Sequence, residues 1–275
     1  MGYAMLNTQK NRIDSCIHHL QQQNKSALVT FITAGDPVMI DTVQIMHAMA
    51  DNGVDIIELG VPFSDPMADG PTIQRSSDRA VRNGINLLSI LDMVSKFRQI
   101  NQTTPIVLMG YANTFSYYQQ TLGIDNLASK FQNSGVDGIL LVDMPPENDK
   151  NRTVFAKYNL HNIYLISPTT TTERIEYINN NASGYIYYVA LKGVTGAKTL
   201  DVSGLTDYLP QLKQKINLPI TVGFGIDSPE VAGKIAKHAD GIVIGSKIIS
   251  ILENTPKENQ IDALVDFVKS ISKAI

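Results

Sequence analysis

The chain has 275 residues, of which 43% are hydrophobic and 18% charged, so it can build a core and is not intrinsically disordered. Lysine and arginine number 23 against 26 acidic residues, and the net charge of −3 gives no reason to expect binding to nucleic acid or to an anionic membrane. A single cysteine, Cys16, excludes an intramolecular disulfide and favours a reducing compartment. Neither a long apolar run nor a signal-peptide core is present, so we expect a cytoplasmic protein.

Short apolar segments recur along the chain, and each is apolar on both faces. Such segments are typical of parallel strands that are covered by helices on one side and by a packed interior on the other. Amphipathic stretches between them, such as residues 41–52 and 87–100, are predicted to be the intervening helices. We predict strands at residues 27–33, 56–60, 105–109, 138–142, 162–166, 185–189, 219–223 and 241–244.

These units predict an α/β fold, a (β/α)8 or TIM barrel, because a doubly wound sheet would usually carry fewer strands or a second domain. We expect residues 1–275 to form one domain, in which residues 1–26 are an extension with an extra helix at 14–23 that covers the lower mouth. A weak internal repeat, a small residue followed by aspartate and a strand, supports the alternation. It occurs at residues 53–56, 135–138 and 239–242.

The first candidate for catalysis is Glu58, because barrel enzymes place catalytic groups at the carboxyl ends of their strands. Strand alternation directs Ile57 and Leu59 toward the helices and Glu58 into the barrel. Burial of a carboxylate is costly, so the pKa of Glu58 should be raised. A salt bridge from Glu58 to a neighbouring strand is the structural alternative.

The loop after this strand, residues 61–71, contains Asp65 and Asp69 together with three prolines that stiffen it. Either aspartate could be catalytic, or could instead be a turn or N-cap residue. A glycine-bearing loop at residues 192–197 follows the sixth predicted strand and could close over a ligand.

Glycines after the last two strands indicate a phosphate site. Gly223 and Gly225 follow the seventh strand, and Gly245 and Ser246 follow the eighth, where a helix start would direct backbone N–H groups at an anion. We find no dinucleotide-binding motif, no P-loop and no His/Cys cluster with metal-ligand spacing, so we expect no metal and no cofactor.

Residues 58–71 read Glu-Leu-Gly-Val-Pro-Phe-Ser-Asp-Pro-Met-Ala-Asp-Gly-Pro and closely resemble the signature of the tryptophan synthase alpha subunit family. The similarity continues through residues 111–113, 193–196 and 223–226, and it extends from about residue 26 to the end of the chain. A fourteen-residue match is more specific than any argument from a barrel fold.

The resemblance implies cleavage of indole-3-glycerol phosphate to indole and glyceraldehyde 3-phosphate, without a cofactor in this subunit. By position, Glu58 and Asp69 match the catalytic carboxylates, and Tyr187 matches an active-site tyrosine near Glu58. Tyr111 matches a residue lining the indole pocket, and Thr195 a residue that hydrogen-bonds the acid of the 61–71 loop. The remaining candidates for substrate binding are Phe31, Gly196, Gly223, Gly225, Gly245 and Ser246.

The resemblance also implies a partner, a pyridoxal-phosphate-dependent beta subunit, in an α₂β₂ assembly that passes indole between sites. The loops 62–71, 143–146 and 192–197 are expected on one rim that a docked protein could order. Residues 114–123 form a longer segment than in some relatives, on the side where the partner docks.

Two other functions are consistent with some of these features. Lys192, after the sixth strand, could be the lysine of a Schiff-base aldolase, although its glycine-rich loop would not lower its pKa. A non-catalytic regulatory subunit that binds a phosphorylated ligand is the second alternative, but such a protein has no need of the inward carboxylate of Glu58.

Overall fold

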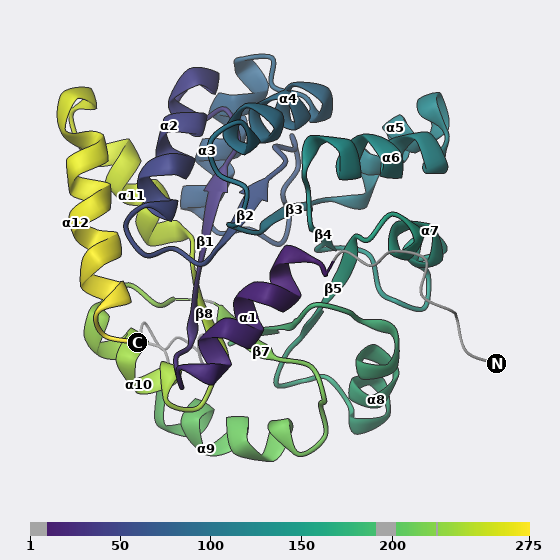
Figure 1. Ribbon diagram of the computed structural model, residues 1–275, viewed down its shortest axis with the longest axis vertical. Coiled ribbons are helices and arrows are strands. Elements are labelled where there is room, and N and C mark those ends of the chain that lie inside the picture. Colours follow the sequence, from purple (N-terminus) through teal and green to yellow (C-terminus); the bar gives the residue numbers. More distant parts are fainter. Residues whose placement is uncertain (1–9, 191–201, 224) are drawn as a thin grey trace.

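A computed structural model describes residues 10–190, 202–223 and 225–275, and its strands form one closed parallel barrel (Figure 1). β1 pairs with β2 on one side and with β8 on the other, which closes the sheet. The predicted (β/α)8 barrel is confirmed, and no predicted strand boundary differs from the observed one by more than one residue. The strands are β1 (Ala27–Thr33), β2 (Ile56–Gly60), β3 (Ile106–Gly110), β4 (Gly138–Leu141), β5 (His161–Ile166), β6 (Ile186–Val189), β7 (Ile220–Gly223) and β8 (Gly241–Ile244).

Helices surround the barrel and alternate with the strands (Figure 1). They are α1 (Arg12–Gln22), α2 (Met39–Ala50), α3 (Pro71–Arg82), α4 (Leu87–Arg98), α5 (Ala112–Leu122), α6 (Ile124–Ser134), α7 (Arg152–Lys157), α8 (Thr172–Asn181), α9 (Val202–Lys213), α10 (Pro229–Ala236), α11 (Ser246–Asn254) and α12 (Gln260–Ser272), with a 3-10 turn at Lys257–Asn259. The segment after β3 that looked longer than in relatives is folded as α5.

The helix α1 covers the amino-terminal mouth of the barrel and faces the viewer in Figure 1. Asn11 caps it by accepting a hydrogen bond from the Ile13 backbone N–H. Its buried side chains join the cluster inside the barrel rather than the cluster between strands and helices, so α1 closes the lower end of the core. The expected extra helix is confirmed and begins two residues earlier than predicted.

The aspartates of the internal repeat clamp neighbouring strands together at this mouth. Asp55 donates its backbone N–H to the Leu28 carbonyl at 2.9 Å and accepts the Leu28 N–H on its side chain at 2.8 Å. Asp137 makes the same pair of bonds with Ile106, and Asp240 makes it with Ile220. Each aspartate therefore precedes an even-numbered strand and fixes its register against the strand before it.

A fourth clamp uses serine in place of aspartate. Ser183, which precedes β6, donates its N–H to the Asn162 carbonyl and accepts the Asn162 N–H on its hydroxyl, both at 2.9 Å. All four even-numbered strands are thus held in the same way. The aspartate of the sequence repeat therefore sets the register of a strand pair.

Asp137 has the most partners of these residues. Its carboxylate also binds the buried guanidinium of Arg98 and that of Arg12, both at 2.9 Å. Its backbone carbonyl accepts a hydrogen bond from the Asn11 side chain. The start of α1, the end of α4 and two strands therefore meet at one carboxylate.

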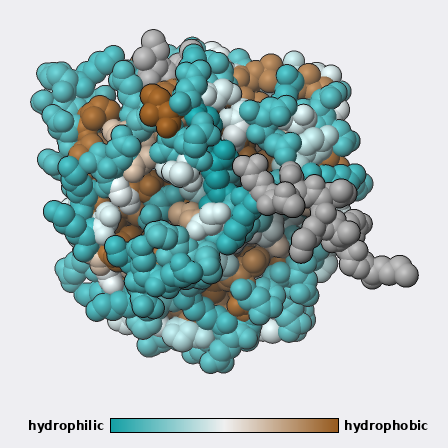
Figure 2. All heavy atoms as spheres, in the orientation of Figure 1, coloured by the Kyte–Doolittle hydropathy of each residue, from teal (hydrophilic) through white to brown (hydrophobic). Residues whose placement is uncertain are grey.

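No helix in the described ranges is long and apolar enough to cross a membrane. The face around α1 is covered mainly by hydrophilic residues, with apolar ones scattered among them (Figure 2).

Replacing Asp137 with asparagine should lower the free energy of unfolding by about 3 kcal/mol, because asparagine keeps an acceptor for the Ile106 N–H but leaves the Arg98 guanidinium buried without a charge partner. Urea denaturation measures the loss. In the matched control Asp78→Asn, which touches only the exposed pair with Arg82, the change should stay within about 0.5 kcal/mol. Equal effects in the two variants would contradict the clamp.

Candidate active site

Glu58 lies in the middle of β2, and its side chain points into the barrel interior with no exposed surface. Its neighbours Ile57 and Leu59 belong to the cluster between strands and helices, as alternation predicted. One carboxyl oxygen, Oε1, accepts a 2.6 Å hydrogen bond from the Tyr185 hydroxyl. The other, Oε2, is buried and has no hydrogen-bond partner within the described part of the chain. Glu58 is therefore held by one oxygen and free to react with the other.

Burial raises the pKa of Glu58 from 4.5 to about 7, and the hydrogen bond from Tyr185 opposes part of that rise. Among the described residues, no cation forms an ion pair with the Glu58 carboxyl. The alternative, a structural salt bridge from Glu58 to a neighbouring strand, is therefore wrong for this part of the chain. A carboxyl group with a pKa near 7 exchanges a proton readily at neutral pH, which is what general acid and base catalysis requires.

Tyr185 was not among the predicted site residues. Tyr187 was expected near Glu58, but the direct hydrogen bond comes from Tyr185, two residues earlier on the same face. Tyr187 lies further along, and the charges of both Glu58 and Asp69 add to the burial that raises its pKa. The two tyrosines therefore line one side of the barrel interior, from Glu58 toward the carboxyl-terminal mouth. Alternation through residues 185–189 places both tyrosines on the inward face, but it does not decide which of them contacts Glu58.

Asp69 lies in the β2–α3 loop, residues 61–70, where Tyr111 fixes its position. The Tyr111 hydroxyl donates to Asp69 Oδ2 at 2.8 Å and accepts the Ala68 N–H at 2.9 Å. Burial raises the pKa of Asp69, and the bond from Tyr111 opposes the rise. The Tyr111 ring stacks on Phe63 of the same loop, with centroids 5.2 Å apart. Tyr111 thus holds the acidic loop against the end of β3.

Asp65 differs from Asp69 in its surroundings. It is exposed, and its carboxylate accepts a hydrogen bond from Ser64 next to it. On the adjacent rim Asp143 accepts the Ala112 N–H at 2.7 Å, which ties the loop after β4 to the start of α5. Of the two loop aspartates, only Asp69 is partly buried beside Tyr111.

Phe31, on β1, lies deeper in the same mouth. A Cβ on Gly60 would come within 2.5 Å of the Phe31 ring, and one on Gly245 would come within 3.2 Å of its Cβ. The ring therefore rests on β2 beyond Glu58, and Phe31 lies between β2 and Gly245 at the end of β8.

The candidate phosphate site is the space between the ends of β7 and β8. Gly223 and Val243 are paired across these strands, and a Cβ on Gly223 would come within 2.0 Å of the Tyr187 hydroxyl. Helix α11 starts at Ser246 with Gly245 as its N-cap and no side-chain cap, and it has no acidic residue in its first turn. Its first N–H groups are thus available to an anion. Gly225 is exposed just beyond this place.

Lys192, Thr195 and Gly196, and with them the whole 192–197 loop, lie outside the described residues, as does Phe224. Beyond the last of these residues, Ser228 caps α10, because its hydroxyl accepts the Val231 N–H.

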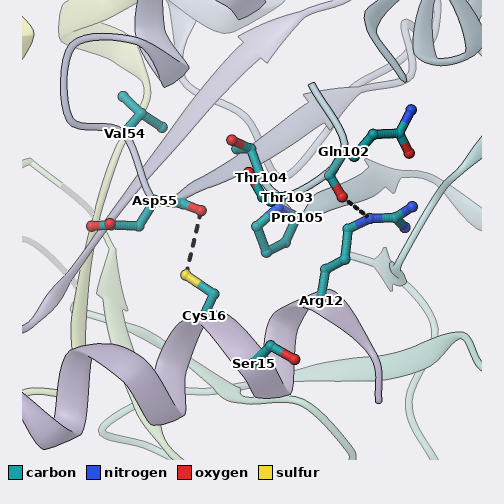
Figure 3. A pocket seen from close by; sticks show the side chains of 9 residues that line it. All are labelled: Arg12, Ser15, Cys16, Val54, Asp55, Gln102, Thr103, Thr104 and Pro105. Atoms are coloured by element: carbon teal, nitrogen blue, oxygen red, sulfur yellow. Dashed lines mark hydrogen bonds between the residues drawn. The ribbon is translucent and has the colours of Figure 1, made fainter. Parts of the chain in front are cut away.

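A cavity of about 420 Å³ lies at the opposite, amino-terminal mouth, between α1 and the starts of β2 and β3 (Figure 3). Cys16 donates its thiol to the Asp55 carbonyl there, and burial raises the pKa of that thiol to about 12. The thiol is therefore protonated at neutral pH. None of the candidate catalytic residues lines this cavity.

Within the described ranges, no three His, Cys, Asp or Glu side chains are grouped to hold a metal ion. A buried carboxyl with a raised pKa, a second carboxylate on a loop and an uncapped helix N-terminus all belong to segments at the carboxyl ends of parallel strands. Together they define a (β/α)8 barrel with candidate acid–base groups and a candidate anion site at one mouth.

Comparisons with known proteins identify the family. Residues 17–275 match the family model described as "Tryptophan synthase alpha chain". The tryptophan synthase alpha chains of Burkholderia ambifaria and Nitrosomonas europaea are both 48% identical, over 96% of this chain and 97% and 95% of theirs. The crystal structure of the alpha subunit from Legionella pneumophila has a TM-score of 0.90 at 41% identity, covering 97% of this chain and 99% of that one. The chain belongs to the tryptophan synthase alpha chain family, and it is a lyase of tryptophan biosynthesis.

The raised pKa of Glu58 makes a prediction about stability. Between pH 4.5 and about 7 the carboxyl ionises in the unfolded chain but keeps its proton in the folded one, so its contribution to stability is lost as pH rises through that window. The free energy of unfolding of Glu58→Gln, relative to that of the wild type, should therefore rise by about 3 kcal/mol between pH 4 and pH 8. This rise should be complete above pH 8. Urea denaturation at both pH values measures it. A difference that does not change with pH would contradict the assignment, and Glu230→Gln, on an exposed pair with Lys234, is the control.

The uncapped start of α11 makes a second prediction. Ser246→Asp places a negative charge where it stabilises the helix but repels phosphate, so binding and stability should move in opposite directions. We expect the Kd for inorganic phosphate, measured by calorimetry, to rise about tenfold while Tm is unchanged or higher. Ser250→Asp, about one turn further along the same helix, is the control that should leave the Kd unchanged. Unaltered phosphate binding in Ser246→Asp would exclude the site.

Proposed function

We propose that this chain cleaves indole-3-glycerol phosphate to indole and glyceraldehyde 3-phosphate, with Glu58 as general acid and then general base. The observation that carries the proposal is the state of Glu58, which is buried inside the barrel with a pKa near 7 and one oxygen, Oε2, free of described partners. Membership of the tryptophan synthase alpha chain family supports the choice of substrate.

The reaction uses the Glu58 carboxyl group twice, first to donate a proton and then to accept another. Protonated Oε2 donates to C3 of the indole ring and gives an indolenine, which draws electrons from the adjacent carbon–carbon bond. The Glu58 carboxylate then removes the proton of the glycerol hydroxyl, whose oxygen becomes the aldehyde oxygen as that bond breaks. The bonding electrons return to the ring as indole leaves, and Glu58 is protonated again. Tyr185 keeps Oε1 in place through both steps.

Asp69 acts on the other side of the ring. Its carboxylate accepts the indole N–H and stabilises the positive charge that forms when C3 is protonated. The hydrogen bond from Tyr111 to Asp69 Oδ2 leaves the second carboxylate oxygen for this contact. Tyr187 and Phe31 line the interior between the two acids and the phosphate end.

The phosphate binds at Gly223, Gly225, Gly245 and Ser246 together with Gly196 of the loop after β6, and Thr195 of that loop hydrogen-bonds the acid of the β2–α3 loop. This places the phosphate at β7 and β8 and the indole at β2 and β3, so the substrate crosses the mouth. The chemistry needs no metal and no cofactor in this subunit.

The partner is a tryptophan synthase beta subunit that carries pyridoxal phosphate, in an α₂β₂ assembly in the cytoplasm. Two exposed apolar side chains support a docking rim at this mouth, Met67 on the β2–α3 loop with 79% of its surface exposed and Tyr117 on α5 with 63%. The link from Asp143 to Ala112 joins the loops on that rim, so a docked partner would order them together.

The direct test is to incubate the purified chain with indole-3-glycerol phosphate and measure indole, alone and with the beta subunit. Glu58→Gln should lower turnover by about a hundredfold to ten-thousandfold or more, because the amide can neither give nor take the proton. Asp69→Asn, which keeps an acceptor for Tyr111, should also lower turnover strongly while phosphate affinity stays the same. Retention of more than about a tenth of the wild-type rate by Glu58→Gln would refute its role.

A further inference from the structure

An ion-pair bridge joins α3 to the end of α11 at two arginines. Glu253 of α11 accepts two hydrogen bonds from Arg75, at 2.9 and 2.7 Å, and a third from Arg79 at 2.7 Å. Arg79 in turn makes two bonds to Asp36, at 2.7 and 2.8 Å, in the loop after β1. We define Asp36, Arg75, Arg79 and Glu253 as the α3–α11 bridge.

The geometry of the bridge makes it stiffer than an ordinary surface pair. Asp36 is buried, with 2% of its side chain exposed, and Glu253 is 19% exposed. Hydrogen bonds from the two guanidinium groups lower the pKa of Glu253 to about 2, so it stays ionised throughout the neutral range. Bidentate hydrogen bonds between an arginine and a carboxylate fix the relative orientation of the two groups as well as the distance between them.

Helix α3 also carries the acidic loop. Ser77 accepts the Phe63 N–H and donates to the Phe63 carbonyl, at 2.9 and 2.8 Å. Gln74 donates its side-chain amide to the Asp69 carbonyl at 2.9 Å. The β2–α3 loop is therefore fastened to α3 at both ends, and a shift of α3 would move Asp69 with it.

The other end of α11 is the candidate phosphate site, so the bridge connects the elements that hold the two ends of the substrate. We propose that Glu253 is a positioning residue that fixes the span between Asp69 and the N-terminus of α11. This inference rests on the proposed function. It predicts that a ligand which occupies both ends depends on Glu253, whereas a ligand which occupies one end does not.

The test compares Glu253→Gln with the wild type on ligands of the two kinds. For indole-3-glycerol phosphate, kcat/KM should fall about tenfold, because the acid and the phosphate site are no longer held at the matching distance. The Kd for inorganic phosphate, measured by calorimetry, should change less than about twofold, because the start of α11 is untouched. A merely structural role would weaken both or neither.

Arg75→Gln is the second variant. Arg75 is 54% exposed and its side-chain bonds go only to Glu253 among the described residues, so its removal should leave folding intact and lower kcat/KM in the same direction by a smaller factor. Glu230→Gln, which breaks an exposed pair on α10, is the matched control and should equal the wild type.

The outcomes separate this inference from the proposed function. An active wild type with an unchanged kcat/KM in both bridge variants would overturn the positioning role, and so would a loss of phosphate affinity as large as the loss of kcat/KM. A wild type that forms no indole would refute the proposed function itself.

Discussion

The site depends on strand register, and the clamps at the amino-terminal mouth hold that register. Shifting a strand by one residue turns every side chain to the opposite face, so a slip of β2 would put Glu58 among the helices and Ile57 in the barrel. Asp55 prevents such a slip between β1 and β2 by bonding both backbone groups of Leu28. Asp137, Ser183 and Asp240 make the same pair of bonds in the other three strand pairs. The register of all four pairs is therefore set by residues that lie outside the candidate active site.

Glu58 is an energetic cost that this framework tolerates. A buried carboxyl with few hydrogen bonds destabilises the folded state whenever it is ionised, and among the described residues the Tyr185 hydroxyl alone opposes that cost. A cation beside Glu58 would remove the cost, but it would also lower the pKa and leave the group unable to protonate carbon. The lack of a partner for Oε2 among the described residues is therefore what the proposed chemistry requires.

Local pattern was enough to predict most of the fold. Continuous apolar segments and their spacing located all eight strands and the inward side of Glu58, because parallel strands buried on both faces leave a strong signal. The partners of the catalytic groups were harder to predict, since they depend on which residues of distant strands meet across the interior. The choice between Tyr185 and Tyr187 required the relative height of β2 and β6, which the pattern within one strand does not contain. The hold of Tyr111 on Asp69 likewise joins two loops whose paths were unknown.

The two mouths of the barrel divide stability from function. The amino-terminal mouth has the clamps, the buried pair of Asp137 with Arg98 and the covering helix α1, all of which make contacts independent of any ligand. At the carboxyl mouth, the described residues hold Glu58 through Oε1 and Asp69 through Oδ2, and they supply no side-chain cap at the start of α11. Groups satisfied on one side keep their geometry while the other side remains available to a substrate. The contacts that stabilise the barrel lie at the amino-terminal mouth. The carboxyl mouth can therefore keep polar groups in place for a ligand without using them to hold the fold together.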